Sequence, residues 1–171
     1  FEDAPRAIPM AEALLDHPKA EMRFAGGWLL HLLNLDTAYE KLRRAVDDED
    51  LRLVNLGLSS YSILIQTKKI AEPTYDKLLE IGARLPVKTT KLRRLLWPWL
   101  EFSISRAEAT DLLPRVAADE DWPRLVDRLP DLSASGRQNL VTTIRERKTP
   151  PPGSRELLLK LTGDRSSYVR D

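Results

Sequence analysis

The sequence contains no cysteine and only two histidines among its 171 residues. Without cysteine there can be no disulfide bond, thiolate catalysis or cysteine-ligated metal site. Neither His17 nor His31 is paired with an acid at metal-ligand spacing on one helix, so we expect no zinc site. No apolar run reaches the roughly 18 residues of a transmembrane helix, and no secretory signal opens the chain. These absences predict a protein without metal, cofactor or membrane contact in a reducing, cytoplasmic setting.

Motifs of catalysis are missing as well. There is no nucleophile elbow, P-loop or dinucleotide-binding motif, and we therefore expect no catalytic residues and no enzymatic activity. The net charge is +1, so binding to nucleic acid or membrane would need a local patch. A hydrophobic fraction of 42% and a charged fraction of 31% are typical of a globular protein with many exposed helical faces. The length suits one domain with a substantial core, which we expect to span residues 1–171.

Five short segments of the chain resemble one another as helix openings. Each begins with small or polar residues and has an arginine at its fifth, sixth or seventh position. The segments are 17–24, 48–55, 89–96, 133–140 and 164–171, with Arg23, Arg52, Arg94, Arg137 and Arg170. Irregular spacing of 29 to 43 residues between the arginines is typical of stacked helical hairpins with variable loops. Because the fifth copy stops one turn into its helix, we expect the chain to be a fragment of a longer protein.

Between these openings, helices that are apolar on more than one face alternate with amphipathic helices. Residues 19–33 and 51–65 are of the first kind, which is expected for a helix buried between neighbours. Residues 35–46 are of the second kind, with one apolar stripe and one charged face. Further helices are expected over 73–85, 89–103, 134–147 and 155–162. The sequence thus predicts an all-α fold.

This alternation and the repeated opening resemble the HEAT-repeat family and, more loosely, the armadillo group. The resemblance implies a right-handed α-solenoid of about four helical hairpins with a partial fifth. It also implies that an Asp and an Arg in successive repeats bridge adjacent repeats, and Arg52 and Arg170 match that Arg best. Thr89 and Ser133 replace the acid in the third and fourth copies. HEAT repeats imply a binding or scaffolding role, which is an analogy of fold and does not locate a site.

Two features have structural explanations that we expect to hold. Gly26 and Gly27 lie inside a helix, where a close neighbouring helix explains them better than phosphate binding. The acidic runs 47–50 and 119–121 lie at helix starts, where carboxylates cap free amides and favour the positive end of the helix dipole.

The stretch from Arg84 to Arg94 carries five positive charges and no acid. Trp97 lies off the apolar stripe of the helix expected there, next to Arg94 at the i, i+3 spacing. We expect Lys91, Arg94 and Trp97 to be the best candidates for contact with an acidic protein or a nucleic-acid backbone. Packing of Trp97 on a neighbouring repeat is the structural alternative.

The sequence leads to one functional hypothesis, one alternative and a purely structural interpretation, in which the domain is a spacer within a larger protein and contributes only geometry. The first is a non-catalytic scaffold or regulatory module that binds a protein partner or flanking domains of the same chain. The alternative is nucleic-acid binding through residues 84–94, because HEAT-like repeats also build a family of bacterial DNA glycosylases. Such an enzyme needs a carboxylate and aromatics on one face, for which Asp111, Asp119 and the tryptophans are available, although no motif gathers them.

Overall fold

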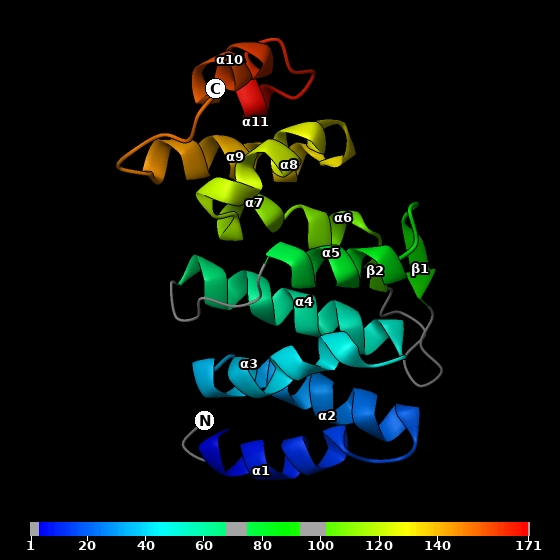
Figure 1. Cartoon of the computed structure of the whole chain (residues 1–171). Helices are drawn as coiled ribbons and strands as arrows, with labels where there is room; N and C mark the ends of the chain where they lie inside the picture. The colour runs from blue at the N-terminus through cyan, green and yellow to red at the C-terminus, as the bar shows by residue number, and fades with distance from the viewer. Residues whose placement is uncertain (1–3, 68–74, 93–101, 171) are drawn as a thin grey trace. The chain divides into compact units, whose positions relative to one another are not determined.

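A computed structural model describes residues 4–67, 75–92 and 102–170, and these are mostly α-helical, as predicted (Figure 1). The chain forms two compact units. The first combines Phe1–Glu72 with Lys88–Ile104, and the second combines Pro73–Val87 with Ser105–Asp171. In the described part of the chain, no helix is long and apolar enough to cross a membrane.

The first unit consists of packed helices and one pair of short strands. Its elements are α1 (Ala4–Leu15), α2 (Ala20–Leu33), α3 (Asp36–Leu42), the 3₁₀ helix η1 (Arg43–Asp47), α4 (Leu51–Gln66), β1 (Thr90–Leu92) and β2 (Phe102–Ile104). The helices expected over 19–33, 35–46 and 51–65 are therefore present as α2, α3 with η1, and α4. Their apolar side chains share one core, which includes Leu15, Phe24, Leu30, Leu42, Leu53 and Leu56.

Two adjacent glycines allow α2 to pack closely on both sides. A Cβ atom on Gly26 would lie 2.6 Å from the carbonyl oxygen of Ala11 in α1. A Cβ atom on Gly27 would lie 2.6 Å from a methyl group of Leu53 in α4. Both distances are shorter than real contacts. At Gly26 the neighbour is backbone, so only glycine permits the approach, whereas at Gly27 a side-chain methyl would have to shift. The prediction that a neighbouring helix explains this pair is confirmed.

The prediction that α2 is buried on more than one face by its neighbours was wrong. Phe24 and Leu30 are buried, whereas Met22 is 39% and Leu32 is 60% exposed. The neighbours α1, α3 and α4 cover only part of the helix circumference, which leaves a stripe of α2 open to solvent.

The prediction of a helix over 89–103 was also wrong, because the structure has strands at both ends of that range. Thr90–Leu92 and Phe102–Ile104 pair in antiparallel fashion, with Thr90 opposite Ile104 and Lys91 opposite Ser103. Thr90, Phe102 and Ile104 are β-branched or aromatic residues that favour strands. Cross-strand pairing therefore prevails over the helical period that the leucines suggested.

The second unit is built from shorter helices. Its elements are α5 (Tyr75–Arg84), α6 (Ala107–Thr110), α7 (Leu113–Val116), η2 (Asp119–Asp121), α8 (Trp122–Asp127), η3 (Leu129–Asp131), α9 (Ala134–Glu146), α10 (Ser154–Leu161) and α11 (Ser167–Arg170). Their core contains Leu78, Ile81, Leu113, Trp122, Leu125, Leu140, Leu157 and Val169, all nearly inaccessible to solvent.

Sequence signals locate the starts of α9 and α10. Ser133 caps α9 as expected, because its hydroxyl accepts hydrogen bonds from the backbone amides of Ser135 and Gly136. Gly153 precedes α10 with a φ of 78°, a left-handed conformation in which glycine is favoured.

Candidate functional site

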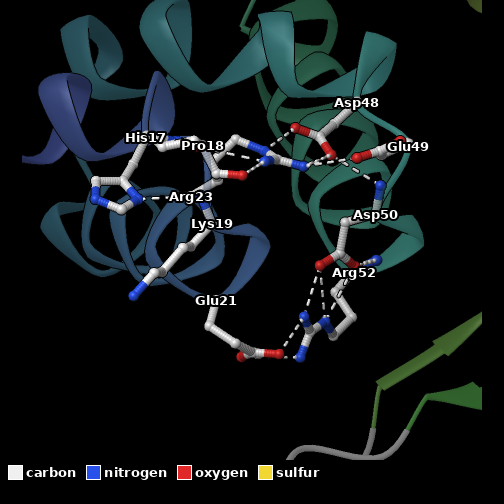
Figure 2. A network of polar contacts seen from close by, with 9 residues as sticks. All are labelled: His17, Pro18, Lys19, Glu21, Arg23, Asp48, Glu49, Asp50 and Arg52. Atoms are coloured by element: carbon white, nitrogen blue, oxygen red, sulfur yellow. Dashed lines mark hydrogen bonds and ion pairs between the residues drawn. The ribbon is translucent and has the colours of Figure 1, made fainter.

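In the first unit, Arg23 joins two helix openings by a bidentate ion pair (Figure 2). Its Nε donates to Oδ2 of Asp48 at 2.8 Å and its Nη2 donates to Oδ1 at 3.1 Å. Its Nη1 donates to the backbone carbonyls of His17 at 3.3 Å and Pro18 at 3.0 Å. The guanidinium is thus held by the start of its own helix and holds an aspartate 25 residues further on.

Arg137 repeats this arrangement in the second unit. Its Nε donates to Oδ2 of Asp164 at 2.6 Å, and its Nη2 donates to Oδ1 at 3.1 Å. Its Nη1 donates to the carbonyl of Leu132 at 2.7 Å. We call each such arrangement, Arg23 with Asp48 and Arg137 with Asp164, an arginine clamp. The same geometry therefore occurs once in each unit.

The aspartate of each clamp is positioned by the backbone that follows it. Oδ1 of Asp48 accepts the amide of Asp50 at 2.8 Å, and Oδ1 of Asp164 accepts the amide of Ser166 at the same distance. This local turn is the typical use of aspartate before a helix. Because the following backbone amide already orients the carboxylate, little side-chain entropy of the aspartate is lost in the ion pair with arginine.

The clamps favour ionised carboxylates. Burial alone would raise the pKa of Asp48, but hydrogen bonds from Arg23 and from the backbone of Asp50 and Glu49 bring it below its usual value. The hydrogen bond from Arg137, followed by that from the amide of Ser166, lowers the pKa of Asp164. Both carboxylates therefore stay charged and hydrogen-bonded, which suits a structural role and leaves no free oxygen for proton transfer.

Arg52 makes a different set of contacts. It binds Asp50, the N-cap of its own helix, with Nη2 to Oδ2 at 2.6 Å. It also pairs with Glu21 of α2 at 2.9 Å, and its guanidinium lies 4.8 Å from the ring centroid of Phe24. Arg52 thus bridges α4 back to α2, and Figure 2 shows it beside the clamp of Arg23.

Arg170 has half of a clamp. Its Nη1 donates to the carbonyl of Asp164 at 2.6 Å, six residues before it, as Arg23 does to His17. It forms no ion pair with a carboxylate in the part of the chain that the structure describes. The resemblance pointed to Arg52 and Arg170 as the bridging arginines. Arg52 does join two openings, through Glu21. The bidentate bridges to an aspartate in a later opening are made by Arg23 and Arg137.

The cleft of interest lies in the second unit, between α8 and α10. Its volume is about 530 Å³, within the usual range for ligand-binding pockets. Apolar groups dominate its lining, and they come from Trp122, Pro123, Val126, Pro152 and Leu157. We call this the α8–α10 cleft.

Charged side chains at the α8–α10 cleft are mainly acidic. Asp119, Asp127 and Glu156 line it together with a single basic residue, Lys160. Asp119 is already paired with Arg147 at 2.5 Å. Within the described residues, no hydrogen bond or ion pair engages the carboxylates of Asp127 and Glu156. The cleft therefore combines an apolar lining with two unpaired negative charges.

Arg147 closes one side of the buried indole that lines this cleft. Its guanidinium lies 5.3 Å from the ring centroid of Trp122 and donates to the carbonyl of Ala117 as well as to Asp119. Trp122 is only 1% exposed. Contacts within the protein therefore hold this indole in place.

Asp111, considered for a glycosylase-like site, instead binds Ser133, the N-cap of α9. Its carboxylate accepts hydrogen bonds from the amide of Ser133 at 3.0 Å and from the Ser133 hydroxyl. Burial raises the pKa of Asp111, against the hydrogen bonds from Ser133 and the amide of Gly136. Gly136 packs so closely that a Cβ atom there would overlap the carboxylate. The carboxylate oxygens of Asp111 are thus occupied by hydrogen bonds within the protein.

Of the contact residues expected from the sequence, only Lys91 lies within the described residues. It is exposed in β1, opposite Ser103. Arg94 and Trp97 lie outside the described residues. Sequence reasoning missed both clamps and the α8–α10 cleft. A signal for the clamps was present, because Arg23 and Arg137 are among the arginines that recur in the helix openings.

Comparison with known proteins gives one match. A family model described as "Family of unknown function (DUF5724)" matches residues 1–171. No curated protein and no solved structure matches the chain. Among the described residues, no group of three or more histidines or acids could hold a metal ion.

Proposed function

The chain belongs to the family of unknown function DUF5724, and we propose that it is a non-catalytic helical-repeat module that binds a protein partner. Its architecture in this proposal is a right-handed α-solenoid of HEAT-like hairpins. The partner is a separate protein or a flanking domain of the same chain. The absence of cysteine supports the reducing, cytoplasmic setting that we propose for it.

Recurrence of the arginine clamp supports the repeat architecture. In each unit, an arginine near the start of one helix holds an aspartate before a later helix, 25 residues on in one case and 27 in the other. In both cases the guanidinium is also anchored to carbonyls five or six residues before it. A recurring contact between successive elements is what repeat proteins use to stack.

Occupied carboxylates support a non-catalytic role. The acids whose pKa values are shifted by hydrogen bonding or burial include Asp48, Asp111 and Asp164. Each has its oxygens engaged by an arginine, a hydroxyl or backbone amides. A general acid or base needs an oxygen that faces a substrate, and these three carboxylates face neighbouring helix starts.

The α8–α10 cleft is the observation that carries the binding role. It offers an apolar, concave surface whose acids Asp127 and Glu156 have no partner in the described chain. Charge without an internal partner contributes little to folding, but it attracts an oppositely charged ligand and fixes its orientation. A module that only supplied geometry would have no need of such a surface.

Affinity purification of the tagged full-length protein tests the proposal. We expect one partner to be recovered in near-stoichiometric amounts, identified by mass spectrometry and absent from a tag-only control. Light scattering should then give the mass of the complex. A protein that elutes as a monomer with nothing bound, from cells cross-linked before lysis, contradicts a partner-binding role.

Nucleic-acid binding through residues 84–94 is the second candidate. It is favoured by Lys88 and Lys91, whose side chains are exposed within this continuous run of positive charge. A gel shift at about 50 mM salt with micromolar protein tests it, because phosphate contacts weaken steeply as salt rises. Binding that fades with salt and is reduced by Lys88→Ala with Lys91→Ala supports this candidate. No shift under these conditions rejects it.

A further inference from the structure

The α8–α10 cleft points to a particular kind of partner. We infer that it binds a peptide segment with one apolar side chain flanked by lysine or arginine. This inference rests on the proposed partner-binding role and names the chemistry of that partner. It is carried by the shape of the cleft and by the charges at its edge.

The apolar part of the ligand follows from the lining. Val126, Leu157 and the two prolines Pro123 and Pro152 present hydrocarbon to a space of about 530 Å³. A space of this size holds a leucine or phenylalanine side chain together with adjacent peptide backbone. Removing such a side chain from water stabilises a complex, whereas a charged group placed there would lose its hydration.

The basic part of the ligand follows from the acids. Asp127 is the last residue of α8, where the helix dipole disfavours a negative charge and helix stability gives no reason for aspartate. Glu156 lies in the first turn of α10, a favourable position, but its carboxylate is still unpaired. Because Arg147 already pairs with Asp119, two acids without a partner among the described residues and one lysine, Lys160, remain in the lining. A cationic segment complements this surface, and an acidic one is repelled.

Two pools of nine-residue peptides test the inference on the full chain. In the first pool, one leucine, isoleucine or phenylalanine is flanked by lysine or arginine. In the second, glutamate replaces each lysine and arginine. Binding is measured by fluorescence anisotropy, and the contact surface is located from amide chemical-shift changes in NMR spectra.

We expect the basic pool to bind and to shift the amides of Val126 and Leu157. The double variant Asp127→Lys with Glu156→Lys should weaken this binding at least tenfold. Glu40→Lys in α3 of the first unit makes one such acid-to-lysine change at an exposed residue and should leave binding unchanged. Raising the salt from about 50 to about 500 mM should weaken binding to the unmodified protein, a result that needs no variant to fold.

Equal binding of the two pools, or no loss in the double variant, would overturn the inference. So would binding with shifts confined to residues outside the cleft, and so would no binding of either pool at millimolar peptide. The proposed function fails separately: if cross-linked cells yield a partner that the double variant still retains, the module binds proteins by another surface. If dimers form and the double variant abolishes them, the occupant is a second copy of the chain and not a basic peptide.

Discussion

The guanidinium of Arg137 and the carboxylate of Asp164 meet edge to edge, with two parallel hydrogen bonds of 2.6 and 3.1 Å. The side chains are 22% and 9% exposed, so water competes little for either group. This geometry requires the planar fork of arginine. It fixes the loop before α11 to the start of α9, and its counterpart in the first unit does the same for α4 and α2.

Arg137→Lys should lower the melting temperature clearly, because lysine cannot replace the bidentate pair or reach the Leu132 carbonyl at the same time. The matched control is Arg170→Lys, in which only one backbone contact changes. Differential scanning calorimetry of the two variants measures the difference. Equal, small losses would mean that the Arg137 clamp contributes nothing to folding.

Gly26→Ala should destabilise the first unit by about 1–3 kcal/mol, because the new methyl group meets the backbone of α1, which cannot move aside easily. Gly82→Ala in α5 is the matched control. Its Cβ would have no neighbour closer than 3.6 Å, and removing a helical glycine should stabilise by about 0.5–1 kcal/mol. Urea unfolding monitored by circular dichroism measures both, and a stabilising Gly26→Ala would contradict the packing of α1 on α2.

Asp48→Asn should make the melting temperature less dependent on pH in the acidic range. The pKa of Asp48 is lower in the folded protein than its ordinary 3.8, so its ionised form adds stability above that value. This stability is lost as the pH falls through the folded pKa. The variant should therefore melt below the unmodified protein at neutral pH, and the difference should shrink as the pH falls below the ordinary pKa of 3.8. A constant difference across this range would show that the charge of Asp48 is not responsible.

His31→Phe should lose less stability than the unmodified protein when the pH is lowered mildly. Burial lowers the pKa of His31 below 6.5, and its Nδ1 is buried without a hydrogen bond in the described structure. As the pH falls below about 6.5, the unfolded chain takes up a proton there before the folded chain does, and stability decreases. Phenylalanine keeps an aromatic ring beside Trp28 and Tyr39 but cannot titrate. Melting temperatures from pH 7.5 to 5 should fall less for the variant.

The helices of the first unit could be predicted because their signals are local. The apolar period over 51–65 and the aspartate that caps it mark α4 within one residue, and the glycines at 26 and 27 indicate close packing whichever helix is the neighbour. The chemistry of those residues does not depend on distant parts of the chain. Their agreement with the structure follows from backbone propensity and capping alone.

The strands at Thr90 and Ile104 could not be predicted in this way. Their stability comes from each other across the sheet, and a three-residue strand carries too few side chains to show alternation. The leucines between them suggested a helical period instead. Partners of the arginines were hidden for a related reason: the sequence places Arg137 near Leu132, but only the fold brings Asp164 to it.

The α8–α10 cleft was beyond sequence reasoning altogether. Asp127 and Glu156 each have an ordinary explanation as exposed helical acids, and only the structure places them around one hollow. What distinguishes them is the lack of an internal partner in the described chain, which no sequence pattern reports. Apolar lining residues such as Val126 and Leu157 look like any core position of a short helix.

The order of the two units along the chain constrains how they can be made. Residues of the second unit, Pro73–Val87, are synthesised before the segment Lys88–Ile104 that completes the first. During synthesis, α5 therefore leaves the ribosome before all residues of either unit have been made. Its apolar face stays exposed until α6 and α7 have been synthesised. For the same reason, no single cut in the chain separates the two complete units from each other. Shortened versions for expression should retain both units or rejoin Glu72 to Lys88 by a designed linker.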